Sequence, residues 1–478
     1  RPPPRSTLFP YTTLFRSHLF DCDGGHLRRK AEVLADQPGQ AVDGQQIIDG
    51  GVGLVAHAEA IGRGDQETYG SLINTLKNKH LQIIQELFAN TIIRDTITDT
   101  VGHLFDELDV ICRSAYVLGE VTPRGVDAIC SFGERINARI FSELLRQKGL
   151  DSLPLDTTQL IVTDSCFQNA HPILEKTREK VDGTMVPLLK EGNIVVVTGF
   201  IAANEQGVTT TLGRGGSDYT AAILGDALDA AEVWTWTDVD GVLSADPRIV
   251  PEAKVIPELS FIEVGEMAYF GAKVLHPKTI RPIVERNIPL WVKNTFNPNQ
   301  PGTRISQNPP SHPGKITAIT TIRDLSIITV AGRGMLGVPG IAARTFTAVA
   351  QQGTSVLMIS QSSSEQSICF VIPTENSISV IKSLEEEMAL ELIRNDIDRV
   401  SSVDDMVILS VIGAGMRETP GVSARIFGAL GRAGINVVAI AQGSSEYSIS
   451  MAVAAEDADR AVRQIHHDII EVEEGSEL

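Results

Sequence analysis

Glycines, one arginine and one aspartate gather in a single short segment of the chain. The run Thr211-Leu-Gly-Arg-Gly-Gly-Ser-Asp218 places Arg214 among three glycines and ends on Asp218. Glycines let a backbone approach a ligand closely, and a guanidinium binds carboxylates and phosphates with two parallel hydrogen bonds. The segment therefore favours an anion site at a helix start, although a plain turn in which Ser217 or Asp218 caps the next helix needs the same residues.

A second segment, Ser131-Phe-Gly-Glu134, has two interpretations. The pattern S-x-x-E is that of a capping box, in which the Ser and Glu side chains satisfy the free N–H groups at a helix start. This predicts a helix over 135–146. Alternatively, Glu134 aims its carboxylate at the ammonium group of a ligand, with Ser131 beside it.

Two further segments carry charged residues near predicted strand ends. Thr237-Asp238-Val-Asp-Gly241 follows an apolar run over 233–237 and leads to Arg248. Ligands of open α/β sheets bind at the carboxyl ends of strands, although Asp240-Gly241 alone is an ordinary turn. Phe270-Gly-Ala-Lys-Val-Leu-His276 places Lys273 in an apolar stretch, where an ammonium group is rarely without a partner, and His276 there is typical of a structural histidine.

Together these segments favour phosphoryl transfer. They offer two arginines, a lysine, aspartates, threonines and glycine turns, but no Cys–His or Ser–His pair. Phosphoryl transfer consists mostly of holding phosphates in line and neutralising their charge. If the acceptor is a carboxylate, it is already ionised at neutral pH and needs no general base. The P-loop and protein-kinase motifs are absent from the sequence.

The spacing of apolar residues predicts the elements that position these segments. Helices are expected over 67–88 and 97–112. Beyond residue 131 short β-branched runs alternate with helical stretches such as 219–231, as a mostly parallel sheet covered by helices requires. The predicted strands are 160–163, 194–198, 233–237 and 290–293.

The C-terminal part of the chain is duplicated. Twelve residues between Gly334 and Ile368 recur exactly 81 positions later, among them Gln361, which recurs as Gln442. Each copy follows the order βαββα, which predicts two ferredoxin-like βαββαβ modules side by side. A segment at 308–314 with three prolines and one glycine separates them from the α/β domain.

Composition excludes several classes of protein. A chain of 478 residues predicts about three domains, and its net charge of −19 argues against nucleic acids or anionic membranes as partners. No apolar run approaches the ~20 residues of a membrane span. The five cysteines are scattered without metal-ligand spacing, so no protein-held metal is expected, and they favour a reducing cytoplasm.

These segments, in this order and ahead of a duplicated module, resemble aspartate kinase, an amino-acid kinase domain followed by two ACT regulatory domains. The resemblance covers about 55–478, and its signals are SFGERINARIF, VVVTGFIAANEQGVTTTLGRGGSDYTAA, TDVDGVLSADPR and FGAKVLHP. It implies a three-layer α/β sandwich and two ACT domains. The implied domains are a non-native segment at 1–17, a catalytic domain at 18–306, a linker at 307–316, and ACT domains at 317–398 and 399–478.

The resemblance also implies an activity and roles for single residues. The activity is transfer of a phosphoryl group from ATP, with Mg²⁺, to the β-carboxylate of L-aspartate, the first step of lysine, threonine and methionine synthesis. Glu134 and Ser131 would bind the aspartate at its ammonium end and Arg214 its carboxylate, while Asp218 would help to organise the reacting centre. The implied nucleotide contacts are Gly199, Thr237, Asp238, Arg248 and Lys273, and Arg214, Asp218 and Lys273 would be catalytic.

The front of the chain departs from the family pattern. The family begins with a strand and loop of the type K-F-G-G-T-S, whose lysine stabilises the transferring phosphate, followed by a strand near S-A-x-x-G-V-T. Here Arg1–Ser17 resembles a non-native insertion, and Gln40–Gly53 occupies the second position with other residues. Loss of a phosphate-binding cation commonly costs orders of magnitude in rate, so an impaired kinase that acts as an amino-acid sensor is the alternative function.

The ACT region resembles the threonine-sensitive type. In that type glutamines such as Gln361 and Gln442 contact the effector, while the neighbouring S-S-E residues could simply form polar turns. Threonine, or lysine, is therefore the expected effector, and an ACT pair implies a homodimer or a larger homo-oligomer. Another amino-acid kinase, acting on glutamate, acetylglutamate or UMP, is a weaker interpretation because of the duplicated ACT module.

Overall fold

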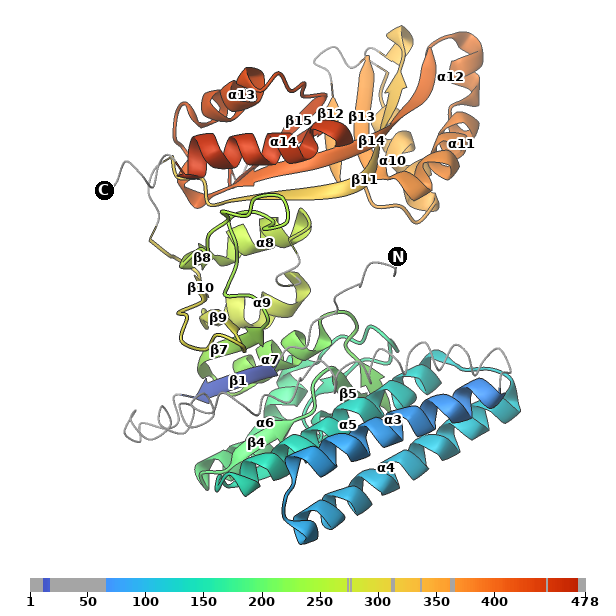
Figure 1. The fold of residues 1–478 in the computed structure, drawn as a ribbon. Helices are drawn as coiled ribbons and strands as arrows, with labels where there is room; N and C mark the ends of the chain where they lie inside the picture. The colour runs from blue at the N-terminus through green and yellow to red at the C-terminus, as the bar shows by residue number, and fades with distance from the viewer. Residues whose placement is uncertain are drawn as a thin grey trace. The chain divides into compact units, whose positions relative to one another are not determined.

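The computed structural model describes residues 12–17, 66–272, 275, 277–310, 314–335, 338–361, 366–443 and 446–471. The chain divides into two compact units (Figure 1). The first contains Arg1–Gly241 and Leu275–Gln307, and the second contains Val242–Val274 and Asn308–Leu478. The segment at 242–274, which the sequence assigns to the catalytic domain, thus packs with the C-terminal modules.

Three long helices form one end of the first unit. They are α3 (Gln66–Leu87), α4 (Thr91–Leu118) and α5 (Pro123–Gln147), and their apolar faces pack into one buried cluster. Asn90 caps α4 by accepting the N–H groups of Ile92 and Ile93, and Gly119 ends it in a left-handed conformation. The two N-terminal helices predicted from apolar spacing are confirmed, and α4 is longer than predicted.

The capping box predicted at Ser131 and Glu134 is wrong. The helix α5 begins at Pro123, with Thr122 as its N-cap, so both residues lie in its interior. The Ser131 hydroxyl is fully buried and donates to the carbonyl of Ala128 in its own helix. Thr122 and a proline in the first turn are the stronger signal for a helix start. The S-x-x-E pattern cannot form a capping box inside a helix, because the backbone N–H groups there already donate to carbonyls of the preceding turn.

The strands of the first unit pair in both directions. The strands β2 (Ser152–Leu155) and β4 (Ile194–Val197), β3 (Val162–Thr163) and β5 (Ile201–Asn204), and β7 (Ala230–Thr237) and β9 (Leu290–Asn294) are parallel pairs. The pairs of β5 with β6 (Thr209–Thr211), β9 with β10 (Thr303–Ser306), and β7 with β1 (Thr12–Ser17) are antiparallel. The strand β1 comes from the segment that the sequence sets apart as non-native.

Helices α6 (Leu174–Lys190), α7 (Gly216–Ala227) and α9 (Pro277–Glu285) complete this unit. The helix predicted over 219–231 ends earlier, because Asp229 adopts a left-handed conformation with φ 46° and the chain turns into β7. The helix α7 packs with α6 and with apolar residues of β4 and β5 in one buried cluster. A short 3-10 turn, Thr157–Gln159, precedes β3.

The second unit is built on one six-stranded sheet with the order β12-β13-β11-β14-β16-β15. The predicted order of elements in each copy is confirmed. The first copy contains β11 (Ala318–Ala331), α10 (Ile341–Gln351), β12 (Met358–Gln361), β13 (Ser367–Pro373), α11 (Ser377–Glu387) and α12 (Ala389–Arg394). The second contains β14 (Arg399–Ile412), α13 (Val422–Arg432), β15 (Ala439–Gln442), β16 (Ser448–Ala454), α14 (Ala455–Ile465) and the π-helical turn His466–Glu471.

The two copies exchange halves of their long central strands. The second half of β11 pairs with β13 of its own copy, and its first half pairs with residues 408–412 of β14. Residues 406–412 of β14 in turn pair with β16, while residues 399–403 pair with β11. Each copy therefore receives the last strand of its sheet from the other, so the two copies form one folding unit.

The segment at 242–274 lies against this sheet. It contains β8 (Glu258–Ser260) and α8 (Phe261–Tyr269), which lies beside β11 and β14 (Figure 1). Ile249 and Val250 enter the core of the C-terminal copy. A capping box does exist in this segment, where Ser260 and Glu263 bond each other's backbone N–H groups.

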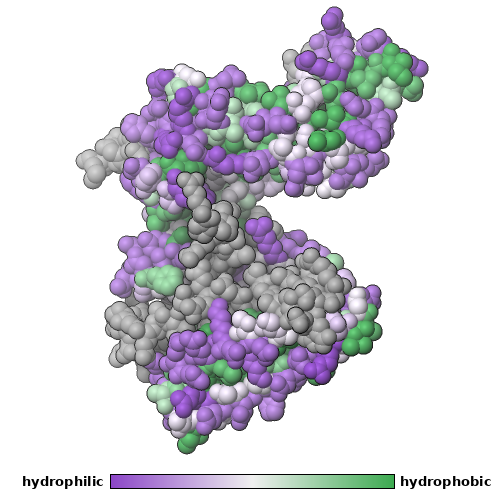
Figure 2. All heavy atoms as spheres, turned by 45° about the vertical axis from the view of Figure 1, so that its right-hand side comes forward, coloured by the Kyte–Doolittle hydropathy of each residue, from purple (hydrophilic) through white to green (hydrophobic). Residues whose placement is uncertain are grey.

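Apolar side chains remain exposed at one end of the second unit. Ile378, Leu390 and Ile393, on α11 and α12, are 84%, 62% and 77% exposed, and Figure 2 shows green surface at this end. Among the described helices none is long and apolar enough to cross a membrane. The described cysteines, at 112, 130, 166 and 369, are not paired in disulfides.

Candidate functional site

Two glycines allow the turn after β4 to touch the start of α7. A Cβ atom on Gly199 would lie 2.7 Å from the Ser217 Oγ, and one on Gly216 would lie 2.6 Å from the Phe200 Cδ2 and 3.1 Å from its Cα. Phe200 itself has a left-handed backbone with φ 64°, and its N–H donates to the Thr220 Oγ1 at 3.0 Å. No larger residue fits either glycine position without a shift of the turn.

Glu134 reaches this turn from α5. Its Oε2 accepts the N–H of Gly199 at 3.2 Å. Burial raises the pKa of Glu134 to about 7, and the hydrogen bond from Gly199 opposes that shift. Glu134 is therefore a carboxylate that a ligand cation would ionise, which is the functional alternative named from the sequence.

Arg214 and Asp218 lie on either side of the N-cap residue Gly215 in the sequence. Arg214 is exposed between Gly213 and Gly215, whose φ angles of 77° and 70° form the turn into α7. Asp218, in the first turn of α7, is 7% exposed, and burial raises its pKa to about 7. Its Oδ1 has no hydrogen-bond partner within the described part of the chain, so this carboxylate is set to receive a polar or cationic group.

Sequence reasoning missed Asp127. This residue is 1% exposed on α5, and its carboxylate accepts hydrogen bonds from the backbone of Gln168 and Thr211 and from the Thr211 hydroxyl. Its position seven residues before Glu134 on one helix is the signal that was available, because such residues share a helix face.

The ends of β7 and β9 form a second polar cluster. Thr237 is buried at the end of β7, and its hydroxyl donates to the Asp238 Oδ1 at 3.1 Å. Asn294, at the end of β9, donates to the Asp240 Oδ1 at 2.7 Å. Because the two strands are parallel, their carboxyl ends meet at one edge of the sheet. Asp240 follows β7 and accepts a hydrogen bond from the end of β9, so it links the two strand ends in addition to its place in a turn.

The remaining candidates of the catalytic domain lie elsewhere. Arg248 belongs to the second unit, where its exposed guanidinium pairs with Asp246 at 2.6 Å. Lys273 and His276 lie outside the described residues, as does Gln40–Gly53. Ser131 has its hydroxyl turned to its own helix, as described above. No group of three or more His, Cys, Asp or Glu side chains in the described ranges could hold a metal ion.

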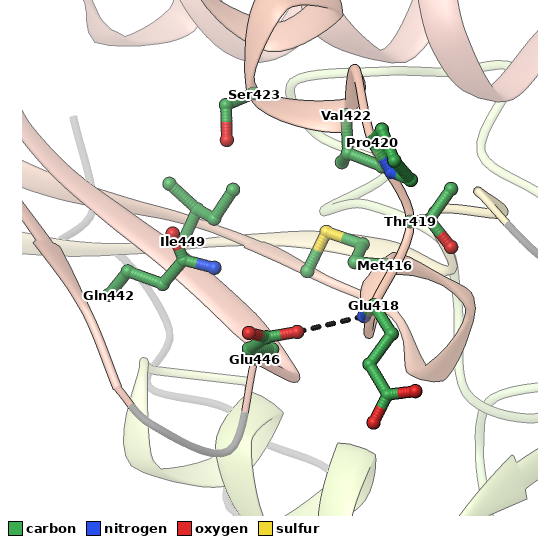
Figure 3. Close-up of a pocket in the computed structure, with 9 residues that line it drawn as sticks. All are labelled: Met416, Glu418, Thr419, Pro420, Val422, Ser423, Gln442, Glu446 and Ile449. Atoms are coloured by element: carbon green, nitrogen blue, oxygen red, sulfur yellow. Dashed lines mark hydrogen bonds between the residues drawn. The ribbon is translucent and has the colours of Figure 1, made fainter.

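The second unit contains a pocket of about 260 Å³ in the C-terminal copy (Figure 3). Gln442, at the end of β15, and Ile449, on β16, lie on one side, and Thr419, Pro420, Val422 and Ser423 lie on the other. Met416 forms its apolar floor. Glu446 closes the lower rim by accepting the N–H of Glu418 at 2.8 Å.

The lining of this pocket suits a small zwitterion. The helix α13 begins at Val422 after the N-cap residue Gly421, and no side chain caps it; its first residues, Val422 and Ser423, line the pocket, so its free N–H groups are available as donors for a carboxylate. Glu418 and Glu446 offer oxygens to an ammonium group. Both hold left-handed backbones, with φ 53° and 57°, a conformation that costs free energy in residues other than glycine.

The two copies differ at this pocket. Positions 81 residues before Glu418, Thr419 and Ser423 hold Gly337, Val338 and Ala342. Gln361 is exposed at the end of β12, as Gln442 is at the end of β15, but part of the lining expected around Gln361 lies outside the described residues. Glu418, Thr419 and Ser423 are thus specific to the C-terminal copy, whereas Gln442 and Glu446 have sequence counterparts in Gln361 and Glu365.

Comparison with known proteins identifies the family. The model of the amino acid kinase family matches residues 51–294. The chain belongs to this family. The model of an ACT domain matches residues 328–388 and 409–469, two ranges that are offset by 81 residues, as the repeat is.

The similar proteins are aspartokinases. Lysine-sensitive aspartokinase 3 of Escherichia coli is 32% identical over 419 residues, which cover 87% of this chain and 90% of that protein. The chloroplastic bifunctional aspartokinase/homoserine dehydrogenase 2 of Arabidopsis thaliana is 37% identical over 409 residues. That match covers 84% of this chain but 44% of the relative, so this amino acid kinase spans less than half the length of the bifunctional relatives.

Solved structures show the same fold. The crystal structure of E. coli aspartokinase III in complex with aspartate and ADP matches with a TM-score of 0.69 and 30% identity, over 87% of this chain and 91% of that chain. The complex of that enzyme with lysine and aspartate matches with a TM-score of 0.71 over 87% and 90%. The expected architecture, an amino-acid kinase domain followed by ACT domains, is confirmed.

Proposed function

We propose that this chain phosphorylates the β-carboxylate of L-aspartate with ATP, giving 4-phospho-L-aspartate and ADP, the first step of lysine, threonine and methionine synthesis. The observation that carries the proposal is the meeting of Glu134, Gly199 and the Arg214 turn at the start of α7. A carboxylate and a guanidinium at one site match the two ends of an amino acid. The similarity to an aspartokinase solved with aspartate and ADP supports the same substrates.

Each site residue then has a role in the proposed reaction. Glu134 binds the ammonium group and Arg214 the α-carboxylate, which leaves the β-carboxylate oxygen to attack the γ-phosphorus of ATP as its bond to the bridging oxygen breaks. Asp218, buried in the first turn of α7, orients the reacting groups, with Lys273 as the phosphate-binding cation. Because the acceptor oxygen is already ionised, no proton has to be removed.

The nucleotide is proposed to bind at the polar edge of β7, through Thr237 and Asp238, with Gly199. Mg²⁺ would neutralise phosphate charge when bound.

We propose that the ACT domains inhibit the kinase when an amino acid, threonine in the first place and lysine as the alternative, binds beside Gln442 and Gln361. The zwitterion-matched pocket at Gln442 supports this, and the solved complex of E. coli aspartokinase III with lysine supports the lysine alternative.

The exposed apolar residues of α11 and α12 support a homodimer or larger assembly. A monomeric mass in light scattering would contradict the assembly. Unpaired cysteines support the cytoplasm as the compartment.

Aspartate-dependent ADP release tests the catalytic proposal. We would assay this chain beside a variant that carries the family's K-F-G-G-T-S strand at its front, each with and without threonine. Turnover that requires aspartate and falls with threonine supports the proposal. Threonine binding without ADP release by either chain would favour the alternative function, an amino-acid sensor.

A further inference from the structure

The carboxylate of Asp127 connects three parts of the first unit. Its Oδ2 accepts the N–H of Gln168 at 2.9 Å and the N–H of Thr211 at 3.0 Å, and its Oδ1 accepts the Thr211 hydroxyl at 2.7 Å. These donors lie on the loop after β3 and at the end of β6. Asp127 itself lies on α5, so one buried side chain joins a helix, a loop and a strand.

The loop that Asp127 holds forms the wall behind the Arg214 turn. Gln168 has a left-handed backbone with φ 69°, and the next two residues contact the turn. The N–H of Ala170 donates to the Thr211 carbonyl at 2.9 Å. A Cβ atom on Gly213 would lie 2.9 Å from the Asn169 Oδ1 and 3.1 Å from the Gln168 carbonyl oxygen.

Asn169 is also fixed from the other side. The ammonium group of Lys278 donates to the Asn169 Oδ1 at 2.7 Å and lies 5.6 Å from the ring centre of Tyr219 on α7. The loop behind Gly213 is thus bonded to α5 through Asp127. Lys278, which bonds the same loop, also contacts Tyr219 of α7. Arg214, the next residue, is exposed, and this turn sets the position of its backbone.

We propose that Asp127 is a positioning residue for the aspartate site: it fixes the Arg214 turn at a constant distance from Glu134, two helical turns further along α5. The proposal rests on the proposed function, in which these two residues bind the ends of aspartate. A shift of one relative to the other weakens aspartate binding without affecting the nucleotide edge at β7.

The test is Asp127→Asn in the full chain, with Asp226→Asn as the matched control. Asp226 is also a buried aspartate, 6% exposed, but it pairs with Arg178 and Arg286 away from this turn. We expect Asp127→Asn to raise the Kd for aspartate in calorimetry about tenfold or more, because an amide cannot accept all three hydrogen bonds. The Kd for ADP should not change, and amide hydrogens at 209–216 should exchange faster.

A second pair of variants keeps the test valid if Asp127→Asn does not fold. Thr211→Val removes the hydroxyl donor and should weaken aspartate binding, whereas Thr211→Ser retains it and should bind as the wild type does. Equal Kd values for aspartate in all variants overturn the inference, and so does an equal loss of aspartate and ADP binding. If the wild-type chain binds ADP but no aspartate, the proposed function fails and the inference with it.

A separate observation concerns the helix α8 and the pocket of the C-terminal copy. Glu263, 3% exposed, uses Oε2 in the capping box and Oε1 to accept the N–H of Ala414 at 2.8 Å. One turn later the Glu266 Oε2 accepts the hydroxyl of Ser448 at 2.6 Å. Ala414 lies two residues before Met416 and Ser448 directly before Ile449, so α8 holds two walls of the pocket.

The chain after α8 rests on the same sheet and leads to Lys273. Phe270 is buried in a cluster with strand residues of both copies. Gly271, with φ 98°, fits so closely that a Cβ atom would lie 2.5 Å from the Thr321 carbonyl oxygen. At its last residue α8 also meets the first copy, where the Tyr269 hydroxyl donates to the Leu357 carbonyl at 3.4 Å.

We infer that α8 transmits occupancy of the C-terminal pocket, rather than of its counterpart at Gln361, to residues 270–272 that follow it. The inference deepens the proposed regulation and depends on it. A free α-amino acid that closes the two walls changes the contacts of Glu263 and Glu266 together, because both side chains belong to one short helix.

Hydrogen exchange of the full chain tests this without kinase activity. Threonine, and lysine in a parallel experiment, should slow exchange at 261–272 in the wild type. Gln442→Ala should abolish that effect, while Gln361→Ala, its repeat counterpart, should retain it. Ser448→Ala should still bind the amino acid in calorimetry but lose protection of α8, while its counterpart Ser367→Ala should retain both.

The possible outcomes are distinct. Loss of α8 protection in Gln361→Ala but not in Gln442→Ala overturns the inference, as does unchanged α8 exchange in a wild-type chain that binds the amino acid. If neither amino acid binds, the regulatory proposal fails with it, whereas aspartate-dependent ADP release would leave the catalytic proposal standing.

Discussion

The Glu134 carboxylate and the Gly199 N–H lie 3.2 Å apart, although 65 residues separate them in sequence. This contact joins the middle of α5 to the turn after β4, where Gly199 meets Ser217 at the start of α7. Burial raises the pKa of Glu134 to about 7, so near neutral pH the side chain is divided between its neutral and ionised forms. A ligand ammonium group would favour the ionised form.

The affinity for aspartate is therefore expected to depend on pH. Below pH 7 Glu134 is mostly protonated in the free protein, and binding an ammonium group requires release of that proton. The Kd for aspartate should fall as pH rises from 5 to 7, by up to about tenfold per unit, and level off above 7. Calorimetry at several pH values, in buffers of different ionisation enthalpy, measures both the Kd and the released proton.

Glu134→Gln is the control for this dependence. The amide is isosteric but cannot ionise, so its aspartate affinity should be low and nearly constant between pH 5 and 7. A wild-type Kd that does not change over this range would show that Glu134 does not bind the ammonium group.

Asp218 is expected to reduce the stability of the unliganded protein. Its pKa is raised by burial from 3.8 to about 7, so between these values the unfolded chain binds fewer protons than the folded protein. The free energy of unfolding contributed by this group therefore falls as pH rises from about 4 to 7 and stays low above 7. Asp218→Asn should raise the free energy of unfolding at pH 8 by an amount on the order of a few kcal/mol.

The measurement is urea unfolding at pH 4 and pH 8. The wild type and Asp218→Asn should be close in stability at pH 4, where the wild-type carboxyl is protonated in the folded protein and partly protonated in the unfolded chain, and should differ at pH 8. An Asn variant that is less stable at pH 8 would mean that the carboxylate has a stabilising partner.

Part of this architecture was predictable from sequence, because repeated residues and the spacing of apolar residues depend on neighbours close in the chain. The 81-residue offset predicted two copies of one module, and apolar spacing predicted α3 and the interior of α4. The S-x-x-E pattern succeeded or failed according to context: Ser260 and Glu263 form a capping box, whereas Ser131 and Glu134 lie inside a helix whose start is fixed by Thr122 and Pro123. A four-residue pattern does not show where a helix begins.

Long-range relationships were not predictable in this way. Asp127 is one aspartate among many until the loop at Gln168 and the end of β6 are brought to it. The exchange of strand halves between β11 and β14 depends on pairs from Ala331–Arg399 to Ala318–Ile412, which lie 68 to 94 residues apart and which no local periodicity contains. The segment with α8 likewise packs with the ACT sheet because of partners far along the chain, Ala414 and Ser448.

Gly216 is expected to be intolerant of even one methyl group. The added Cβ would lie 2.6 Å from the Phe200 Cδ2 and 3.1 Å from its Cα, so the left-handed turn at Phe200 must shift. Gly216→Ala should lower the free energy of unfolding by about 1–3 kcal/mol and weaken aspartate binding.

Gly183→Ala is its matched control. Gly183 lies exposed on α6, where a Cβ atom would meet nothing within 4 Å. Alanine is the better helix former, so this variant should gain up to about 1 kcal/mol. If both variants are equally stable, the close contact at Gly216 does not constrain the turn.

The three tryptophans of the chain should report nucleotide binding. Trp234, Trp236 and Trp291 surround the ammonium group of Lys293, at 5.0, 5.9 and 5.2 Å from their ring centres. Burial lowers the pKa of Lys293, and its ammonium group donates to the Pro301 carbonyl at 2.9 Å. Because Trp236 directly precedes Thr237 and Asp238, the charge of a nucleotide at this strand end changes the electric field at the three tryptophan rings.

Titration with ADP should therefore give a saturable change in tryptophan emission, with a midpoint equal to the Kd from calorimetry. Thr237→Val should shift both midpoints to higher ADP concentration, because it removes the hydroxyl that bonds Asp238. Threonine should leave the emission unchanged in the absence of nucleotide, since the tryptophans all lie in the first unit and the Gln442 pocket lies in the second. Constant emission at ADP concentrations that saturate the protein in calorimetry would place the nucleotide away from the end of β7.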